Sequence, residues 1–326
     1  MAAIAEHPLQ VAITSRETAE LVSGEPDARP LAGEEIAGRT CVSLISAGTE
    51  LAACYQGERF PAYPGYAAVF EVTAIGLGVT RFRPGDLALC MGPHRSWQRA
   101  READALAVPQ GLDAQSAVFA RMMGVSMSTL ATTTARPGQC VLVTGLGTVG
   151  NLAAQIFTQC GYDVVAVDPS VARRDWAAGA GISNVHAAVP LETLQGKVAL
   201  AVECSGRESA TLDACRVVRK RGEVVLAGVP WKRTCELSSH ELLSTVFHNY
   251  VVLRSGWEWE LPAHNTDFRT GSISENYAMA LRWLAAGKIR VDGLHAKVAP
   301  AGAQSAYQGL LQNSWPALSA VFDWRL

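Results

Sequence analysis

The sequence lacks several features that define other classes of protein. It has eight cysteines but no C-x-x-C pair, so neither a zinc ribbon nor a thioredoxin-type redox pair is predicted. No apolar run approaches the roughly 20 residues that a membrane-spanning helix needs. The 28 Lys and Arg nearly balance the 30 Asp and Glu, so no broad basic surface is expected. We therefore expect neither a membrane nor a nucleic acid as a partner.

A secretory signal is also missing from the first residues. Met1–Gln10 contains Glu6, His7 and Pro8, with neither a basic start nor a long apolar core, so no signal peptide is expected. Scattered cysteines in an apolar chain are typical of reduced, mostly buried thiols. These features favour a cytoplasmic protein.

Apolar side chains, by contrast, are abundant. They make up 49% of the 326 residues, whereas charged residues make up 18%, so the chain can form a large core. At about 150 residues per domain, this length suggests two domains.

In the first 110 residues, turn signals such as Pro84-Gly85-Asp86 separate short β-branched runs, including Cys41–Ile45 and Ala68–Ala74. This texture predicts short strands and tight turns.

After residue 139 the sequence alternates between strand and helix patterns. The clearest helix is Thr148–Cys160, which has an apolar stripe and is followed by Gly161. Continuous apolar runs are typical of parallel strands buried on both faces. Five such runs are predicted as strands: Cys140–Thr144, Asp163–Asp168, Val198–Glu203, Glu223–Val229 and Tyr250–Ser255. The series predicts a doubly wound parallel sheet.

A glycine-rich segment follows the first of these strands. Gly145-Leu146-Gly147-Thr148-Val149-Gly150 is a G-x-G-x-x-G pattern between a strand and a helix. Gly145 allows a tight turn, Gly147 lets a pyrophosphate approach the backbone, and Gly150 lets helix and strand pack closely. Asp168 ends the next strand, where its carboxylate can bind a ribose diol and repel a 2′-phosphate. The segment predicts a site for NAD.

Two arginines leave the phosphorylated cofactor as an alternative. Arg173 and Arg174 follow Asp168 closely, and a nearby arginine can hold a 2′-phosphate. NADP is the less favoured cofactor, because Asp168 stands at the strand end itself.

The order and spacing of several motifs resemble the medium-chain dehydrogenase/reductase family of alcohol, sorbitol and threonine dehydrogenases and quinone reductases. The motifs are Ala47-Gly48-Thr49-Glu50, Pro64-Gly65-Tyr66, Arg83-Pro84-Gly85-Asp86, and Pro137-Gly138 before the glycine-rich segment. The resemblance implies an α/β fold, with a GroES-like β-barrel catalytic domain interrupted by a Rossmann doubly wound parallel-sheet domain. We expect residues 1–119 to form the first part of the catalytic domain, 120–256 the NAD-binding domain, and 257–326 the return to the catalytic domain.

The chain departs from zinc-containing members of that family at the ligand positions. Where those members carry Cys, His and usually Cys, this chain has Ala47, Tyr66 and Ala120, none of which is a zinc ligand. Segment 89–101 has only Cys90, whereas a structural-zinc lobe needs four cysteines. The resemblance therefore implies a zinc-free branch, in which hydrogen-bond donors or a side-chain acid polarise a carbonyl.

Three residues are candidates for that role. Thr49 matches the family's hydroxyl that relays the alcohol proton, and Tyr66 stands where the zinc-binding His would be. A phenol can donate a hydrogen bond to a developing alkoxide. His94, in a Gly-Pro-His turn, has a suitable pKa for acid–base work and is expected farther out, as a relay to solvent. Glu50 is a fourth candidate, although the family's acidic residue there often has a structural role.

The resemblance also implies the cofactor contacts. It assigns the pyrophosphate to the turn residues Gly145, Gly147, Thr148 and Val149. Asp168 is expected to bind the ribose and Arg173 its outer edge. The nicotinamide is expected beside Cys204, Val229 and Ser255. Aromatic and polar side chains in 255–260 and 264–267 suit either a pocket for a polar substrate or a subunit contact.

The leading functional hypothesis is a metal-independent oxidoreductase. It would transfer a hydride between NAD(H) and a secondary alcohol or ketone of a polar or biosynthetic small-molecule substrate. The alternatives are an NADPH-dependent enone or quinone reductase and a non-catalytic dinucleotide-binding protein. Family members commonly dimerise through the last Rossmann strand, here Tyr250–Leu253, so a homodimer is expected.

Overall fold

The chain folds into two compact units in the computed structural model, which describes residues 8–25, 27 and 29–326. Most of Met1–Gln10, in which no signal peptide was expected, therefore lies outside the described residues. Unit 1 comprises Met1–Arg121, Tyr277–Ala285 and Val291–Leu326, and unit 2 comprises Met122–Asn276 and Ala286–Arg290.

The second boundary differs from the one expected after residue 256. Unit 2 continues to Asn276, because the segment after the last parallel strand keeps contacts with that unit. Arg254 Nη1 lies 3.2 Å from Glu260 Oε1, and Asn276 Nδ2 donates to Ser128 Oγ at 3.3 Å. Only from Tyr277 does the chain return to unit 1.

Unit 2 is built on a six-stranded sheet in which every strand pair is parallel. In sheet order the strands are β10 (Val185–His186), β9 (Asp163–Val167), β8 (Cys140–Thr144), β11 (Val198–Glu203), β12 (Val218–Leu226) and β13 (Val252–Ser255). β13 is therefore an edge strand. It begins after the expected Tyr250, because that residue has a φ of +52°, which is not a strand conformation.

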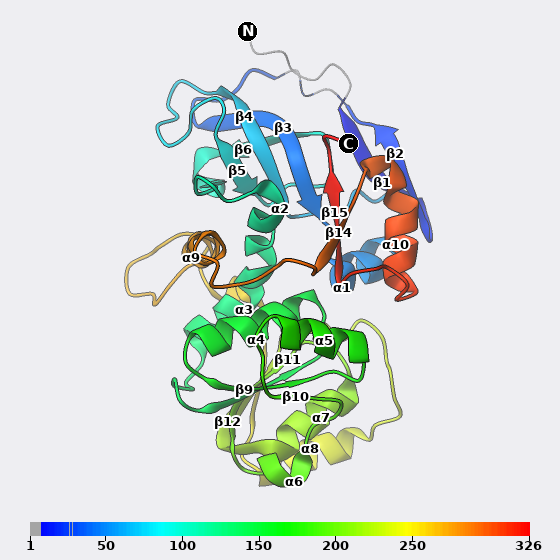
Figure 1. Ribbon diagram of the computed structural model, residues 1–326, viewed down its shortest axis with the longest axis vertical. Helices are drawn as coiled ribbons and strands as arrows, with labels where there is room; N and C mark the ends of the chain where they lie inside the picture. Colours follow the sequence, from blue (N-terminus) through cyan, green and yellow to red (C-terminus); the bar gives the residue numbers. More distant parts are fainter. Residues whose placement is uncertain (1–7, 26, 28) are drawn as a thin grey trace. The chain divides into compact units, whose positions relative to one another are not determined.

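Helices cover both faces of this sheet. α4 (Thr148–Gln159) and α5 (Val171–Gly179) lie on one face, and α7 (Glu208–Val217) and α8 (Ser239–His248) lie on the other (Figure 1). Successive residues of β8 point to opposite faces of the sheet. Val141 and Val143 accordingly pack in one hydrophobic cluster and Leu142 in another. Unit 2 also contains α6 (Leu191–Leu194) and η3 (Glu258–Glu260), whereas α3 (Ala120–Thr132) and α9 (Ile273–Ala285) each contribute residues to both units.

Unit 1 contains a seven-stranded, mainly antiparallel sheet. Its order is β14 (His295–Val298), β15 (Ser319–Asp323), β3 (Glu35–Leu44), β4 (Ala68–Ile75), β5 (Leu87–Cys90) and β7 (Leu106–Ala107), with β6 (Trp97–Arg101) paired to β3. A hairpin of β1 (Leu9–Ser15) and β2 (Thr18–Ser23) lies beside α10 (Ala303–Leu311) (Figure 1). The shorter segments are α1 (Ala47–Glu50), η1 (Leu51–Tyr55), η2 (Glu102–Asp104), α2 (Ala114–Ala117) and η4 (Pro300–Gly302).

These two sheets confirm the predicted fold class, a doubly wound parallel sheet combined with an antiparallel catalytic-domain sheet. All eight cysteines are free thiols, and Cys41, Cys90 and Cys215 are buried. Among the described residues, no helix is both long and apolar enough to span a membrane.

Candidate active site

The glycine-rich turn of unit 2 requires glycine at two positions. Gly145 has a φ of +82°, and a Cβ there would lie 2.7 Å from the backbone nitrogen of Ser205. A Cβ on Gly150 would lie 1.8 Å from the carbonyl oxygen of Gly145, so only glycine lets α4 pack this closely against the turn. These contacts give both glycines the roles that the pattern predicts.

Gly147 occupies a different environment, because a Cβ there would meet nothing within 4 Å. It is the residue before α4, and its φ of −63° is open to any amino acid. Since no protein atom fills the space beside it, this backbone is open to a ligand. The first N–H groups of a helix have no acceptor within the helix and attract anions. The turn therefore fits a pyrophosphate, which Gly147, Thr148 and Val149 would hold.

Asp168 has two bonds to its own unit. The residue is 1% exposed, and its carboxylate accepts hydrogen bonds from the backbone N–H of Leu146 at 2.7 Å and of Ser170 at 2.8 Å. It therefore ties the end of β9 to the glycine-rich turn. A carboxylate has about four acceptor sites, and these two bonds together with the nearby Arg173 guanidinium occupy part of them.

The two arginines after Asp168 have different contacts. Arg173 Nη1 lies 3.5 Å from Asp168 Oδ2, and its side chain is 38% exposed. Arg174 donates to the carbonyl oxygens of Asp168 and Pro169 at 2.8 and 2.9 Å. Arg173 is therefore the arginine that lies beside the carboxylate predicted to bind the ribose.

The three residues assigned to the nicotinamide lie at the carboxyl ends of their strands but differ in exposure. Cys204 is partly buried under Gly150, and burial raises the pKa of its thiol. Val229 is 41% exposed, and the exposed Ser255 accepts a hydrogen bond from the N–H of Trp257. A cavity of about 410 Å³ borders the same strand ends, lined in part by Glu203, Gly206, Gly228 and Leu253. Cys204 thus has a packing role, whereas Val229 and Ser255 remain accessible.

Unit 1 brings together Tyr66 and Thr49. Ser46 precedes α1, and its N–H donates to Glu50 Oε1 at 2.8 Å, which closes the helical turn that carries Thr49. The phenol of Tyr66 donates to the hydroxyl of Ser46 and also hydrogen-bonds with Thr49. Burial raises the pKa of Tyr66, while those hydrogen bonds and the charge of Arg121 act against the rise. The phenol of Tyr66 therefore keeps its proton at neutral pH.

Arg121 completes this cluster from the first turn of α3. Its guanidinium carbon lies 4.6 Å from the ring centroid of Tyr66 and 5.5 Å from that of Tyr277, on α9. Arg121 is only 5% exposed, so a permanent cation is buried beside the predicted acid.

His94 is not a relay to solvent, and that expectation is wrong. It is fully buried and stacks edge-on against Phe322, at 5.0 Å between ring centroids. Its Nε2 lies 3.0 Å from Glu50 Oε2 and its Nδ1 2.8 Å from Ser43 Oγ. The chain after β5 turns inward here, because Gly65 leaves room for the His94 ring 2.8 Å from where a Cβ would stand.

The surrounding hydrogen bonds assign the tautomer of His94. Trp324 Nε1 donates to Ser43 Oγ at 2.9 Å, so the Ser43 hydroxyl can donate to His94 Nδ1. His94 Nε2–H then donates to Glu50, which also accepts from Tyr307 Oη at 2.5 Å. This buried network connects α1, which carries Glu50, with β3, α10 and Trp324 near the C-terminus.

The donor set does not fit a catalytic zinc. Ala47 and Ala120 offer no side-chain donor atom, and the phenol of Tyr66 is engaged with Ser46 and Thr49. Within the described part of the chain, no three or more His, Cys, Asp or Glu side chains are grouped as a metal site.

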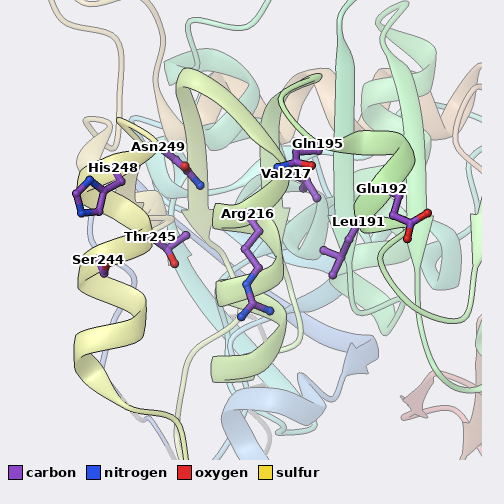
Figure 2. A pocket seen from close by; sticks show the side chains of 9 residues that line it. All are labelled: Leu191, Glu192, Gln195, Arg216, Val217, Ser244, Thr245, His248 and Asn249. Atoms are coloured by element: carbon purple, nitrogen blue, oxygen red, sulfur yellow. The ribbon is translucent and has the colours of Figure 1, made fainter.

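A second cavity of unit 2, of about 440 Å³, lies among α6, α7 and α8 (Figure 2). Arg216 points into it and forms ion pairs with Asp213 at 3.0 Å and Glu241 at 2.5 Å. None of the described lining residues is a predicted site residue, so this cavity is separate from the glycine-rich turn.

Sequence reasoning missed Ser46, Arg121 and Tyr277. One signal was present, since Arg121 is a lone charge in the apolar run 117–123, directly after the position of the third zinc ligand. Tyr277 carried no signal, because it is far from Tyr66 in sequence and reaches Arg121 only in the fold.

Comparisons with known proteins find dehydrogenases among the proteins similar to this chain. Residues 148–258 match the family described as zinc-binding dehydrogenase. A curated alcohol dehydrogenase of Geobacillus stearothermophilus is 25% identical over 210 residues, which cover 53% of this chain. The matched segment spans 62% of that relative, which is less than two thirds of its length.

Solved structures share the fold over nearly the whole chain. Galactitol-1-phosphate dehydrogenase from Escherichia coli superimposes with a TM-score of 0.81 at 16% identity, covering 97% of this chain and 99% of that one. Acetophenone reductase from Geotrichum candidum, solved in complex with NAD, has a TM-score of 0.78 at 16% identity and covers 98% of both chains. At these identities the likeness concerns the fold.

Proposed function

We propose that this chain is an oxidoreductase of the medium-chain dehydrogenase/reductase superfamily that works without a catalytic zinc; the matched family model, the alcohol dehydrogenase relative and the shared fold support this proposal. The observation that carries the proposal is the glycine-rich turn, where Gly145 and Gly150 cannot be replaced and Gly147 faces open space. The substrate class is a secondary alcohol or its ketone, and the cofactor is NAD(H).

Asp168 supports NAD over NADP. Its buried carboxylate sits at the end of β9, 2.7 Å from the turn's own backbone, where a 2′-phosphate would meet a fixed negative charge. Arg173, at 3.5 Å, offsets part of that charge, so NADP binds more weakly without being excluded.

When bound, the nicotinamide supplies or accepts the hydride. The chain's own residues must then manage the proton on the substrate oxygen. Tyr66 carries that proton on Oη, and Ser46 and Thr49 hold the phenol by hydrogen bonds until the substrate oxygen replaces one of them. Positioned acids of this kind contribute roughly 10²–10⁴-fold to rate.

Two other functions are distinguished by one assay. The purified chain is mixed with NAD⁺ and secondary alcohols, or with NADH or NADPH and ketones, enones and quinones, and nicotinamide absorbance is followed. Turnover of alcohols and ketones with NAD(H) supports the proposal. Turnover of enones or quinones with NADPH alone, or tight cofactor binding without any turnover, contradicts it.

Assembly and location are part of the proposal. β13 is an edge strand on which Val252 is exposed, and pairing it across a two-fold axis would cover unpaired backbone groups. We therefore propose a homodimer. Free thiols suit a reducing compartment such as the cytoplasm.

A further inference from the structure

Arg121 is a buried cation held between two aromatic rings. Arginine is almost never buried at 5% exposure unless its charge is compensated. The rings of Tyr66 and Tyr277, at 4.6 and 5.5 Å from the guanidinium carbon, provide part of that compensation through cation–π contacts, which strengthen on desolvation. Tyr277 is itself fixed, because its hydroxyl contacts Met91 Sδ at 3.7 Å.

Arg121 lies next to two of the sequence positions that carry zinc ligands in zinc-containing relatives of the family that this chain resembles. Tyr66 stands where zinc-containing relatives have a histidine ligand, and Arg121 directly follows Ala120, the position of the third ligand. The chain thus has a fixed side-chain charge beside the group that we propose as the acid.

The groups that face Tyr66 come from two elements, α1 with its preceding residue and α3. Ser46 and Thr49 contribute hydroxyls from the turn that starts at α1, Glu50 contributes a buried carboxylate from the same turn, and Arg121 contributes the cation from α3. Glu50 disfavours the phenolate, whereas Arg121 favours it. Among the described groups that face the phenol, Arg121 carries a permanent positive charge, which works with the hydrogen bonds of Ser46 and Thr49 against the effect of burial.

We propose that Arg121 is a positioning residue for Tyr66, which stacks on the phenol ring and supplies the fixed positive charge that lets its hydroxyl act as an acid. This inference rests on the proposed function, in which Tyr66 donates the proton. The inference adds Arg121 to the candidate site, for which the sequence predicted Thr49, Tyr66, His94 and Glu50.

A spectroscopic titration tests the charge without any substrate. Tyr66 is replaced by 3,5-difluorotyrosine through codon suppression, and the fluorine resonance is followed against pH in the full chain. Arg121→Gln keeps a planar head group but removes the charge, and it should raise the titration midpoint by about one unit or more. Arg121→Lys keeps the charge and should stay closer to wild type.

Arg81→Gln is the matched control, because Arg81 also lies over an aromatic ring, 5.8 Å from the centroid of Phe82, but its side chain is 51% exposed. This control should leave the midpoint where it is. An Arg121→Gln midpoint no higher than that of Arg81→Gln overturns the proposal. Should Arg121→Gln fail to fold, the same comparison is made with Arg121→Met, and a charge-free variant with an unchanged midpoint again overturns it.

A double-mutant cycle tests the catalytic consequence. Arg121→Gln should lower kcat by about tenfold or more and leave the KM for NAD(H) unchanged. In a Tyr66→Phe background the same substitution should change kcat less than about twofold, because the group on which it acts is gone. An equal loss in both backgrounds overturns the proposal. If no substrate turns over, the proposed function fails, while the fluorine titration still decides the role of Arg121.

Discussion

Asp168 Oδ2 accepts a hydrogen bond of 2.7 Å from the backbone N–H of Leu146, inside the glycine-rich turn. One carboxylate therefore holds the turn in shape at the place where it would bind a ribose. Stability and cofactor choice are coupled at this residue, and substitutions there must be interpreted with both effects in view.

Asp168→Ser should weaken NAD(H) binding and ease the entry of NADP(H), because the ribose acceptor and its charge are lost. Each lost hydrogen bond costs about 1–3 kcal/mol. The melting temperature should fall as well, since the N–H groups of Leu146 and Ser170 lose their acceptor. Fluorescence titration with NADH and NADPH measures the first effect, and thermal unfolding the second.

Asp168→Asn separates the two effects. It keeps one acceptor oxygen for the turn and removes the charge, so it should retain more stability than Asp168→Ser while still admitting NADP(H). If wild type binds NADPH more tightly than NADH, the argument from Asp168 is wrong.

The metal content should be zero. With Ala47, Tyr66 and Ala120 at the ligand positions, the purified chain should contain no stoichiometric zinc, and a chelator should change neither activity nor melting temperature. Elemental analysis giving one zinc per chain would refute this prediction.

Val252→Lys should shift the chain from dimer to monomer. Val252 is 43% exposed on the edge strand β13, and a charge on that edge opposes strand pairing. Light scattering at micromolar concentration measures the change. Leu77→Lys is the control, because Leu77 is fully exposed in unit 1 and should not affect assembly. A monomeric wild type would contradict the dimer.

Tyr66→Phe keeps the ring and removes the hydroxyl, so turnover should fall by roughly 10²–10⁴-fold with little change in cofactor affinity. Thr49→Val tests in the same way whether the proton passes through the Thr49 hydroxyl. Tyr66→Ala, in contrast, should also lower stability by leaving a cavity beside Arg121. Near-normal turnover in both Tyr66→Phe and Thr49→Val would defeat the assignment.

Glu50→Ala should lower the free energy of unfolding by about 1–3 kcal/mol for each buried donor that it leaves without an acceptor. Glu50 accepts from Ser46, Tyr307 and His94, and all three bonds are lost together. Glu50→Gln should cost less, because one acceptor oxygen remains. Denaturant unfolding measures both variants, and an unchanged midpoint for Glu50→Ala would show that the network does not support the fold.

The strands and helices of unit 2 were predictable because their signals are local. The run Cys140–Thr144 is strand β8 with the predicted bounds, and the helix after Gly147 ends within one residue of its predicted end. The glycines at 145 and 150 were predictable for the same reason, since the backbone conformation and close packing that need them lie within one turn.

The contacts of His94, Arg121 and Tyr277 were decided only by the tertiary structure. A histidine in a Gly-Pro-His turn is normally exposed, but here Ser43 and Glu50, distant in sequence, satisfy both ring nitrogens and allow complete burial. Arg121, at the start of α3, lies over the ring of Tyr277, although many residues separate the two in the chain. The sequence by itself determined the elements and the glycine-rich turn, through local periodicity and sterics. Which polar side chains are buried together depends on long-range packing, which no local pattern encodes.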